Sequence, residues 1–135
     1  MALALLIGSG CKKDSDETCD LNSSSLVGNY KLTAATMQSG SSSPEVSVLN
    51  TYYEPCELDD ILSINANNTF SYQDQGTVCD PSGSFAGNWS LSGNNLSVIA
   101  DGDTATQTIA SFDCNNFVVS SIVTGVTLRE TYTRQ

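Results

Sequence analysis

The sequence predicts an all-β domain that closes into an antiparallel, up-and-down barrel of eight strands. From Leu26 onward, short stretches alternate apolar and polar residues, and Asn, Gly, Asp and Ser separate them about every ten residues, as in antiparallel meanders. Charged residues are only 15% of the 135-residue chain, and Ser, Thr, Asn and Gly fill many of the remaining positions. Barrel closure removes the exposed edges that a flat meander of this size would leave.

Two hairpins are supported by their register, because a correct loop places large apolar side chains on one face. With a two-residue loop at 93–94, Leu91 faces Leu96 and Trp89 faces Val98. The last hairpin follows the same rule. A two-residue loop at 124–125 pairs Val123 with Val126, Ser121 with Leu128, Val119 with Glu130, and Phe117 with Tyr132.

A third hairpin turns near residues 67–68. A three-residue loop with an Asn in the left-handed conformation pairs Ile64 with Phe70 and Leu62 with Tyr72, whereas a two-residue loop would place Ile64 opposite a serine. The region from 40 to 60 is poorly patterned. Further strands are expected near 26–35, somewhere within 45–53, and over 104–112.

Composition excludes several function classes. The formal net charge is −10, which would repel a phosphate backbone, so nucleic-acid binding is not expected. The chain has no histidine, which removes histidine-based acid–base and nucleophilic catalysis and histidine-ligated metals. We expect no enzymatic activity and no cofactor.

The N-terminus resembles a bacterial lipoprotein signal. Residues 1–7 are almost wholly apolar, small residues follow at 8–10, and Cys11 precedes a polar, charged tract. The resemblance implies that residues 1–10 are a signal remnant, that Cys11 is acylated, and that residues 11–24 form a polar tether. No apolar stretch reaches the roughly 20 residues of a spanning helix. We therefore expect an acyl anchor in the lipid bilayer, at the periplasmic face or cell-surface side of the outer membrane in the cell envelope.

Residues 25–135 would then form one domain, and several short motifs occur there in a familiar order. The segment 26–32, with Tyr30 in place of the usual tryptophan, is similar to the first strand of lipocalin-like domains. The segments 60–70, 87–96 and 132–134 resemble later parts of the lipocalin-like domain found in Bacteroidetes cell-envelope lipoproteins. The resemblance implies a barrel in which a basic residue of the last strand packs over the first-strand aromatic. Arg134 or Arg129 would do this over Tyr30, unless both are solvated.

The five cysteines favour an oxidising compartment. Because the number is odd, one cysteine does not take part in an intramolecular disulfide, and we expect this cysteine to be Cys11. The hairpin around residues 67–68 brings Cys56 and Cys79 nearly opposite each other beyond the strand ends, close enough for a bridge. By elimination, Cys19 would pair with Cys114.

Glu130 is the most informative candidate for a ligand site. The last hairpin places it on the same face as Leu128 and Tyr132, where an unpaired carboxylate would be costly. With Ser121 and Gln107 it could orient a polar ligand group in an apolar pocket, although a rim position or an arginine partner would also account for it. The candidate ligand-binding residues are Tyr30, Tyr72, Trp89, Gln107, Ser121, Glu130 and Tyr132.

Acidic residues gather around Cys56, at Glu54, Glu57, Asp59 and Asp60, without the spaced loop of a calcium motif. Solvated loop charge is therefore the favoured interpretation, and no metal site is predicted.

Two functional hypotheses remain. The first is a non-enzymatic binding module for a small hydrophobic or amphipathic ligand. The second is a filled barrel that acts on an unidentified envelope protein, as an interaction module or enzyme inhibitor, through the loop from Gly40 to Glu57. Cavity volume distinguishes them.

Overall fold

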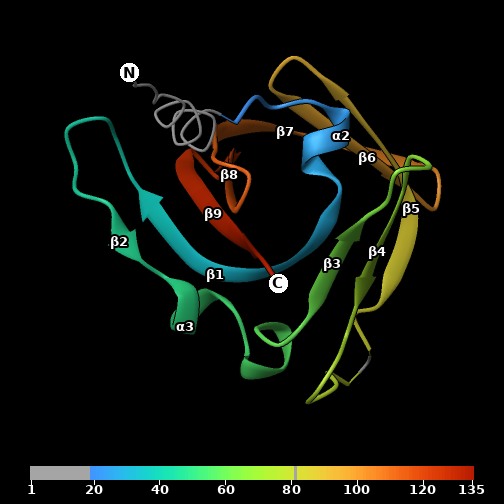
Figure 1. The fold of residues 1–135 in the computed structure, drawn as a ribbon. Coiled ribbons are helices and arrows are strands. Elements are labelled where there is room, and N and C mark those ends of the chain that lie inside the picture. Colours follow the sequence, from blue (N-terminus) through green and yellow to red (C-terminus); the bar gives the residue numbers. More distant parts are fainter. Residues whose placement is uncertain (1–18, 81) are drawn as a thin grey trace, which may run out of the picture.

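The computed structural model describes residues 19–80 and 82–135 and confirms a closed antiparallel barrel (Figure 1). The ring follows chain order, and β1 closes it by pairing with β9, from Tyr30 opposite Arg134 to Gln38 opposite Thr127. The eight ring strands are β1 (Gly28–Gln38), β3 (Ile61–Ile64), β4 (Thr69–Gln73), β5 (Phe85–Ser92), β6 (Asn95–Ala100), β7 (Asp103–Phe112), β8 (Asn116–Val123) and β9 (Val126–Arg134).

The remaining strand, β2 (Val46–Ser47), lies beside β1 and outside the ring. The three hairpins and the three further segments expected from the sequence amount to nine strands, one more than the ring contains. The additional strand is β2. The strand expected within 45–53 is therefore only partly right. Two residues pair with β1, and the chain continues as α3 (Leu49–Tyr52) and the 3₁₀-helix η2 (Pro55–Glu57).

The three hairpins have the expected registers. Leu91 lies opposite Leu96, Ile64 opposite Phe70, and the last hairpin pairs as expected from Val123–Val126 to Phe117–Tyr132. Asn68 has a φ of 66° and so provides the left-handed residue that the loop before β4 requires. These local turns, together with the alternation of apolar residues, set the order and the facing of the strands.

One end of the barrel is closed by α2 (Ser23–Leu26), which lies at the rim of the ring in Figure 1. The Asn22 side chain caps it by accepting a hydrogen bond from the Ser25 backbone N–H at 2.9 Å. Leu26 is fully buried, and its carbonyl accepts a 2.7 Å hydrogen bond from the Tyr30 hydroxyl. The first-strand aromatic is thereby fixed beneath the helix.

Arg134 completes this closed end. Its guanidinium carbon lies 5.0 Å from the centre of the Tyr30 ring, and Nη2 donates to the Tyr30 hydroxyl at 2.9 Å. Arg129 points elsewhere and forms a 3.4 Å ion pair with Glu45. Of the two arginines considered from the sequence, Arg134 therefore takes the closing position.

Gly87 marks a point where two strands approach closely. A β-carbon at this position would lie 2.0 Å from the backbone oxygen of Ile99 in β6. Glycine lets β5 pass this point without displacing its neighbour. Phe70 occupies the interior beside the same position, at 3.0 Å from the β-carbon site.

Two disulfides tie the loops to the barrel. Cys56 is bonded to Cys79, and Cys19 is bonded to Cys114, which are the pairings expected from the sequence. The first joins the segments that lead into β3 and out of β4. The second attaches the segment before α2 to the loop between β7 and β8.

The expected signal remnant, Cys11 and most of the tether fall outside the described residues. Within the part of the chain that the structure does describe, no helix has the length and apolarity needed to cross a bilayer.

Candidate functional site

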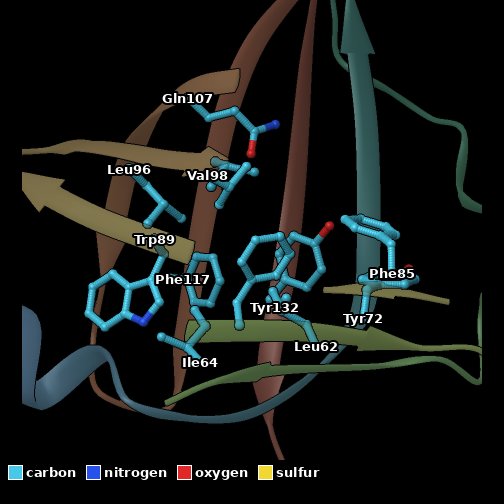
Figure 2. A pocket seen from close by; sticks show the side chains of 12 residues that line it. Leu62, Ile64, Tyr72, Phe85, Trp89, Leu96, Val98, Gln107, Phe117 and Tyr132 are labelled. Atoms are coloured by element: carbon cyan, nitrogen blue, oxygen red, sulfur yellow. The ribbon is translucent and has the colours of Figure 1, made fainter. Parts of the chain in front are cut away.

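The barrel interior contains a cavity of about 140 Å³. Seven of the ring strands contribute to its wall, which is mostly apolar because the inward positions of each strand alternate with outward ones. Figure 2 shows the lining side chains converging on one space between the strands. They are Leu62, Ile64, Phe70, Tyr72, Phe85, Trp89, Leu96, Val98, Gln107, Phe117, Val119 and Tyr132.

Trp89 forms the wall nearest the closed end. Its indole N–H donates to the Asn65 carbonyl at 2.9 Å, so the polar edge of the ring is satisfied and its faces remain available to the cavity. On the opposite side, the rings of Tyr72 and Phe85 stack with centroids 5.4 Å apart, and Figure 2 shows these two residues far from Trp89. The cavity therefore runs between two aromatic walls.

Besides Trp89, whose indole N–H is already bonded, three lining residues carry polar groups, namely Gln107, Tyr72 and Tyr132. Figure 2 shows the Gln107 amide at the top of the lining, above Val98. The Tyr132 ring stacks on Phe117, with centroids 5.1 Å apart, and so has a fixed orientation. A few polar groups in an apolar wall are the usual composition of a small-molecule site.

Burial raises the pKa of both lining phenols. Desolvation, followed by the charge of Asp60, raises the pKa of Tyr72 to about 12. Desolvation also raises the pKa of Tyr132 well above its usual value, and the charge of Glu130 adds to the effect. Both hydroxyls remain protonated at neutral pH and can donate a hydrogen bond to a ligand.

The structure separates the candidate ligand residues into two groups. Four of the seven, Tyr72, Trp89, Gln107 and Tyr132, line the cavity. Tyr30, Ser121 and Glu130 are not among the lining residues. These three candidates therefore lie outside the cavity wall.

Each of the three has a physical reason for lying elsewhere. Tyr30 is fully buried under α2, where its hydroxyl is shared between Leu26 and Arg134. Ser121 lies opposite Leu128 near the β8–β9 turn, beyond the cavity. Glu130 accepts a hydrogen bond from the Tyr53 hydroxyl. This phenol is the polar partner that a carboxylate on an apolar face requires.

Tyr53 is a residue that the sequence analysis did not single out. It follows α3, and its phenol reaches across to β9, so this connection lies against the open end of the barrel. Desolvation and then the hydrogen bond to Glu130 raise its pKa, which keeps Tyr53 in its donor form. No local pattern could identify this contact, because the two residues are 77 positions apart.

Phe85 was also missed. It opens β5, but the segment before Gly87 lacks alternation, so nothing in the sequence marked it as facing inward. Its pairing with Tyr72, which depends on the β4–β5 register, brings it to the cavity.

Comparison with known proteins agrees with this architecture. A sequence model of the lipocalin-like domain matches residues 26–119, more than two thirds of the chain. The match begins at Leu26 and ends at Val119 in β8, so it covers most of the cavity-lining strands. No curated protein sequence gives a significant match. The closed eight-stranded ring, its aromatic-walled interior and this match together show that the chain belongs to the lipocalin-like domain family.

Proposed function

We propose that this protein is a non-enzymatic binding module whose barrel holds one small, largely apolar ligand. The observation that carries the proposal is the cavity of about 140 Å³ with a mostly apolar wall. An apolar cavity of about 150 Å³ binds benzene, whereas drug-sized ligands use pockets of about 300–1,000 Å³. The ligand is thus the size of a single ring or a short chain.

The charges around the open end restrict the ligand further. Desolvation is the main reason that the pKa of Tyr72 is raised, and the nearby carboxyl groups of Asp60, Glu57 and Glu130 add to it, which supports acidic surroundings at this wall. An anionic ligand group would be repelled there, while a neutral hydroxyl or carbonyl could bond to Gln107 or Tyr132. A neutral amphipathic molecule fits best.

Tryptophan fluorescence tests this proposal, because Trp89 is the only tryptophan and lines the cavity. We expect benzyl alcohol to change its emission saturably and benzoate, the anionic analogue, to bind at least about tenfold more weakly because of the acidic surroundings. Native mass spectrometry of the full chain would count the bound molecules and reveal any ligand retained from the cell.

Val98→Phe fills the cavity and should abolish the response. Ile99→Phe is the matched control, since Ile99 is the next residue of β6 and is 44% exposed. Equal responses of the two variants, or no saturable change in the unmodified protein, would contradict the proposal.

We further propose that the protein is a lipoprotein of the cell envelope, anchored in the outer membrane through an acylated Cys11. The support is the signal-like sequence before Cys11 and the odd cysteine count, since Cys19, Cys56, Cys79 and Cys114 bond to one another. Cys11→Ser should move the protein from the membrane to the soluble fraction and remove the acyl mass. Membrane retention without acyl mass would refute the anchor.

An interaction module is the second candidate. Val46 and Tyr52, in the connection between β1 and β3, are 58% and 49% exposed, as expected of residues that meet a protein partner. If Val98→Phe has no phenotype in the producing cell but Val46→Asp with Tyr52→Asp does, the loop and not the cavity carries the function.

A further inference from the structure

Three carboxylates converge at the open end of the β3–β4 hairpin. Asp59 and Asp60 immediately precede β3, and Asp74 immediately follows β4. Because Ile61 lies opposite Gln73, the register continues directly into these acids. One carboxylate oxygen from each of the three lies within 4.8 Å of the others.

Two of these side chains are more than nine-tenths buried and incompletely bonded. Asp60 is 4% exposed and Asp74 is 9% exposed. The Oδ1 atoms of Asp59, Asp60 and Asp74 are buried and have no hydrogen-bond partner among the described residues. A buried carboxylate oxygen without a donor is costly unless a cation or a proton compensates it.

Backbone N–H groups bond the second oxygen in two of the three carboxylates. Asp74 Oδ2 accepts from the N–H groups of Cys79 at 3.0 Å and Gly83 at 2.8 Å, and Asp59 Oδ2 accepts from the Thr77 N–H at 2.6 Å. These bonds hold the Asp74 and Asp59 carboxylates in place while their Oδ1 atoms remain without a donor.

No basic side chain neutralises the group in the described part of the chain, where the sole ion pair is Glu45–Arg129, on another strand. The group therefore needs either a cation or a proton held by Asp60.

We propose that Asp59, Asp60 and Asp74 bind a calcium ion. All the available ligands are carboxylate oxygens, which suits a hard cation and not zinc or copper. Calcium tolerates irregular geometry and completes its shell of about 6–8 oxygens with water or carbonyls, whereas magnesium demands a near-octahedral set.

The surrounding chain is suited to hold such a site. Cys56–Cys79 bonds the two segments together next to the acids. At Gly76, a β-carbon would come within 2.4 Å of Asp59 Oδ2, so the loop after β4 packs directly on the carboxylate. The φ of 62° at this glycine also disfavours other residues there.

Calcium titration of the full, disulfide-bonded chain tests the proposal. We expect calorimetry to show one bound ion with a Kd between about 1 μM and 1 mM, the range of sensor and extracellular sites, and calcium to raise the melting temperature relative to EDTA. Magnesium at the same ionic strength should give a smaller shift. No heat and no shift up to about 10 mM calcium, above the weakest of those affinities, would mean that a proton, not a metal, compensates the acids.

Asp60→Asn keeps the shape of the side chain and removes one ligand charge. It should weaken calcium binding at least about tenfold while remaining folded in EDTA, because it removes a buried like charge. Asp101→Asn is the matched control, because Asp101 lies in the exposed β6–β7 turn with a φ of 54°, which asparagine also tolerates. The calcium affinity of this variant should equal that of the unmodified protein. An equal loss in both variants would indicate only a general charge effect and would overturn the site.

Terbium provides a measurement that does not depend on the variants. Tyr72 lies in β4, two residues before Asp74, so excitation of tyrosine should sensitise the emission of Tb³⁺ bound at these carboxylates. Calcium should displace it competitively. Sensitised emission that calcium does not displace would count against the calcium site.

Discussion

Replacement of Arg134 by methionine should destabilise the barrel more than any other exchange of a basic residue. The guanidinium donates to four oxygens: the carbonyls of Cys114 at 2.7 Å, Val27 at 2.7 Å and Ser25 at 2.9 Å, and the Tyr30 hydroxyl at 2.9 Å. Methionine retains most of the apolar stem but none of the donors.

The expected loss follows from these contacts. A hydrogen bond to a charged group contributes about 1.5–3 kcal/mol, but the side chain is only partly buried, so about 1 kcal/mol for each of the four is a fair scale. The cation–π contact with Tyr30 adds about 0.5–1 kcal/mol. We therefore expect the free energy of unfolding to fall by about 4–5 kcal/mol, a large fraction of the about 5–15 kcal/mol that a domain usually has.

Urea denaturation followed by Trp89 fluorescence measures this loss. Arg129→Met is the matched control on the same strand, because Arg129 forms a half-exposed ion pair with Glu45 and should cost less than about 1 kcal/mol. Arg134→Lys should recover only part of the loss, since a single ammonium cannot reach acceptors arranged for a planar fork. Equal midpoints for the two methionine variants would refute the closing role of Arg134.

Three other predictions concern the frame of the barrel. Gly87→Ala should cost more than about 2 kcal/mol, because the new methyl meets a β6 backbone oxygen, whereas Gly40→Ala in an open loop should be near neutral in the same denaturation assay. Cys56→Ser with Cys79→Ser should lower the free energy of unfolding by about 3 kcal/mol, as expected for a closed loop with a separation of 23 residues; a calorimetric melting temperature unchanged from wild type would contradict this. Asp113 accepts hydrogen bonds from two backbone N–H groups of its own turn, and these bonds lower its pKa. Its contribution to the free energy of unfolding is therefore present above the usual aspartate pKa and is lost as the pH falls through the lowered pKa. The stability difference between wild type and Asp113→Ala should shrink on acidification, and a difference that grows at low pH would contradict this.

Local features of the sequence predicted the fold well. Alternation of apolar residues and the turns at 67–68, 93–94 and 124–125 set three hairpin registers, because a shift by one residue would turn every apolar side chain to the wrong face. The same pattern failed between β1 and β3, where the chain makes one short strand and two helical turns across the open end. That segment has no repeating face to pack.

The cavity was only partly predictable. Four candidates line it because they lie at inward positions of well-patterned strands. Tyr30 and Glu130 also lie at inward positions, but they bond to Leu26 and Tyr53 and do not line the cavity. What decides the difference is depth along the barrel axis, which depends on the stagger of strands far apart in the sequence. Tyr30 reaches the closed end, and Glu130 meets Tyr53 at the other.

Composition and the spacing of apolar residues were sufficient to predict the class of fold and the hairpin registers, since both depend on neighbours a few residues apart. Three features could be recognised only in the folded chain: which arginine closes the barrel, how much space the side chains leave inside, and the proximity of Asp74 to Asp59 and Asp60. Each of these depends on contacts between segments whose separation is set by barrel closure. Side-chain volume and buried charge are balanced in three dimensions, and a one-dimensional pattern does not record that balance.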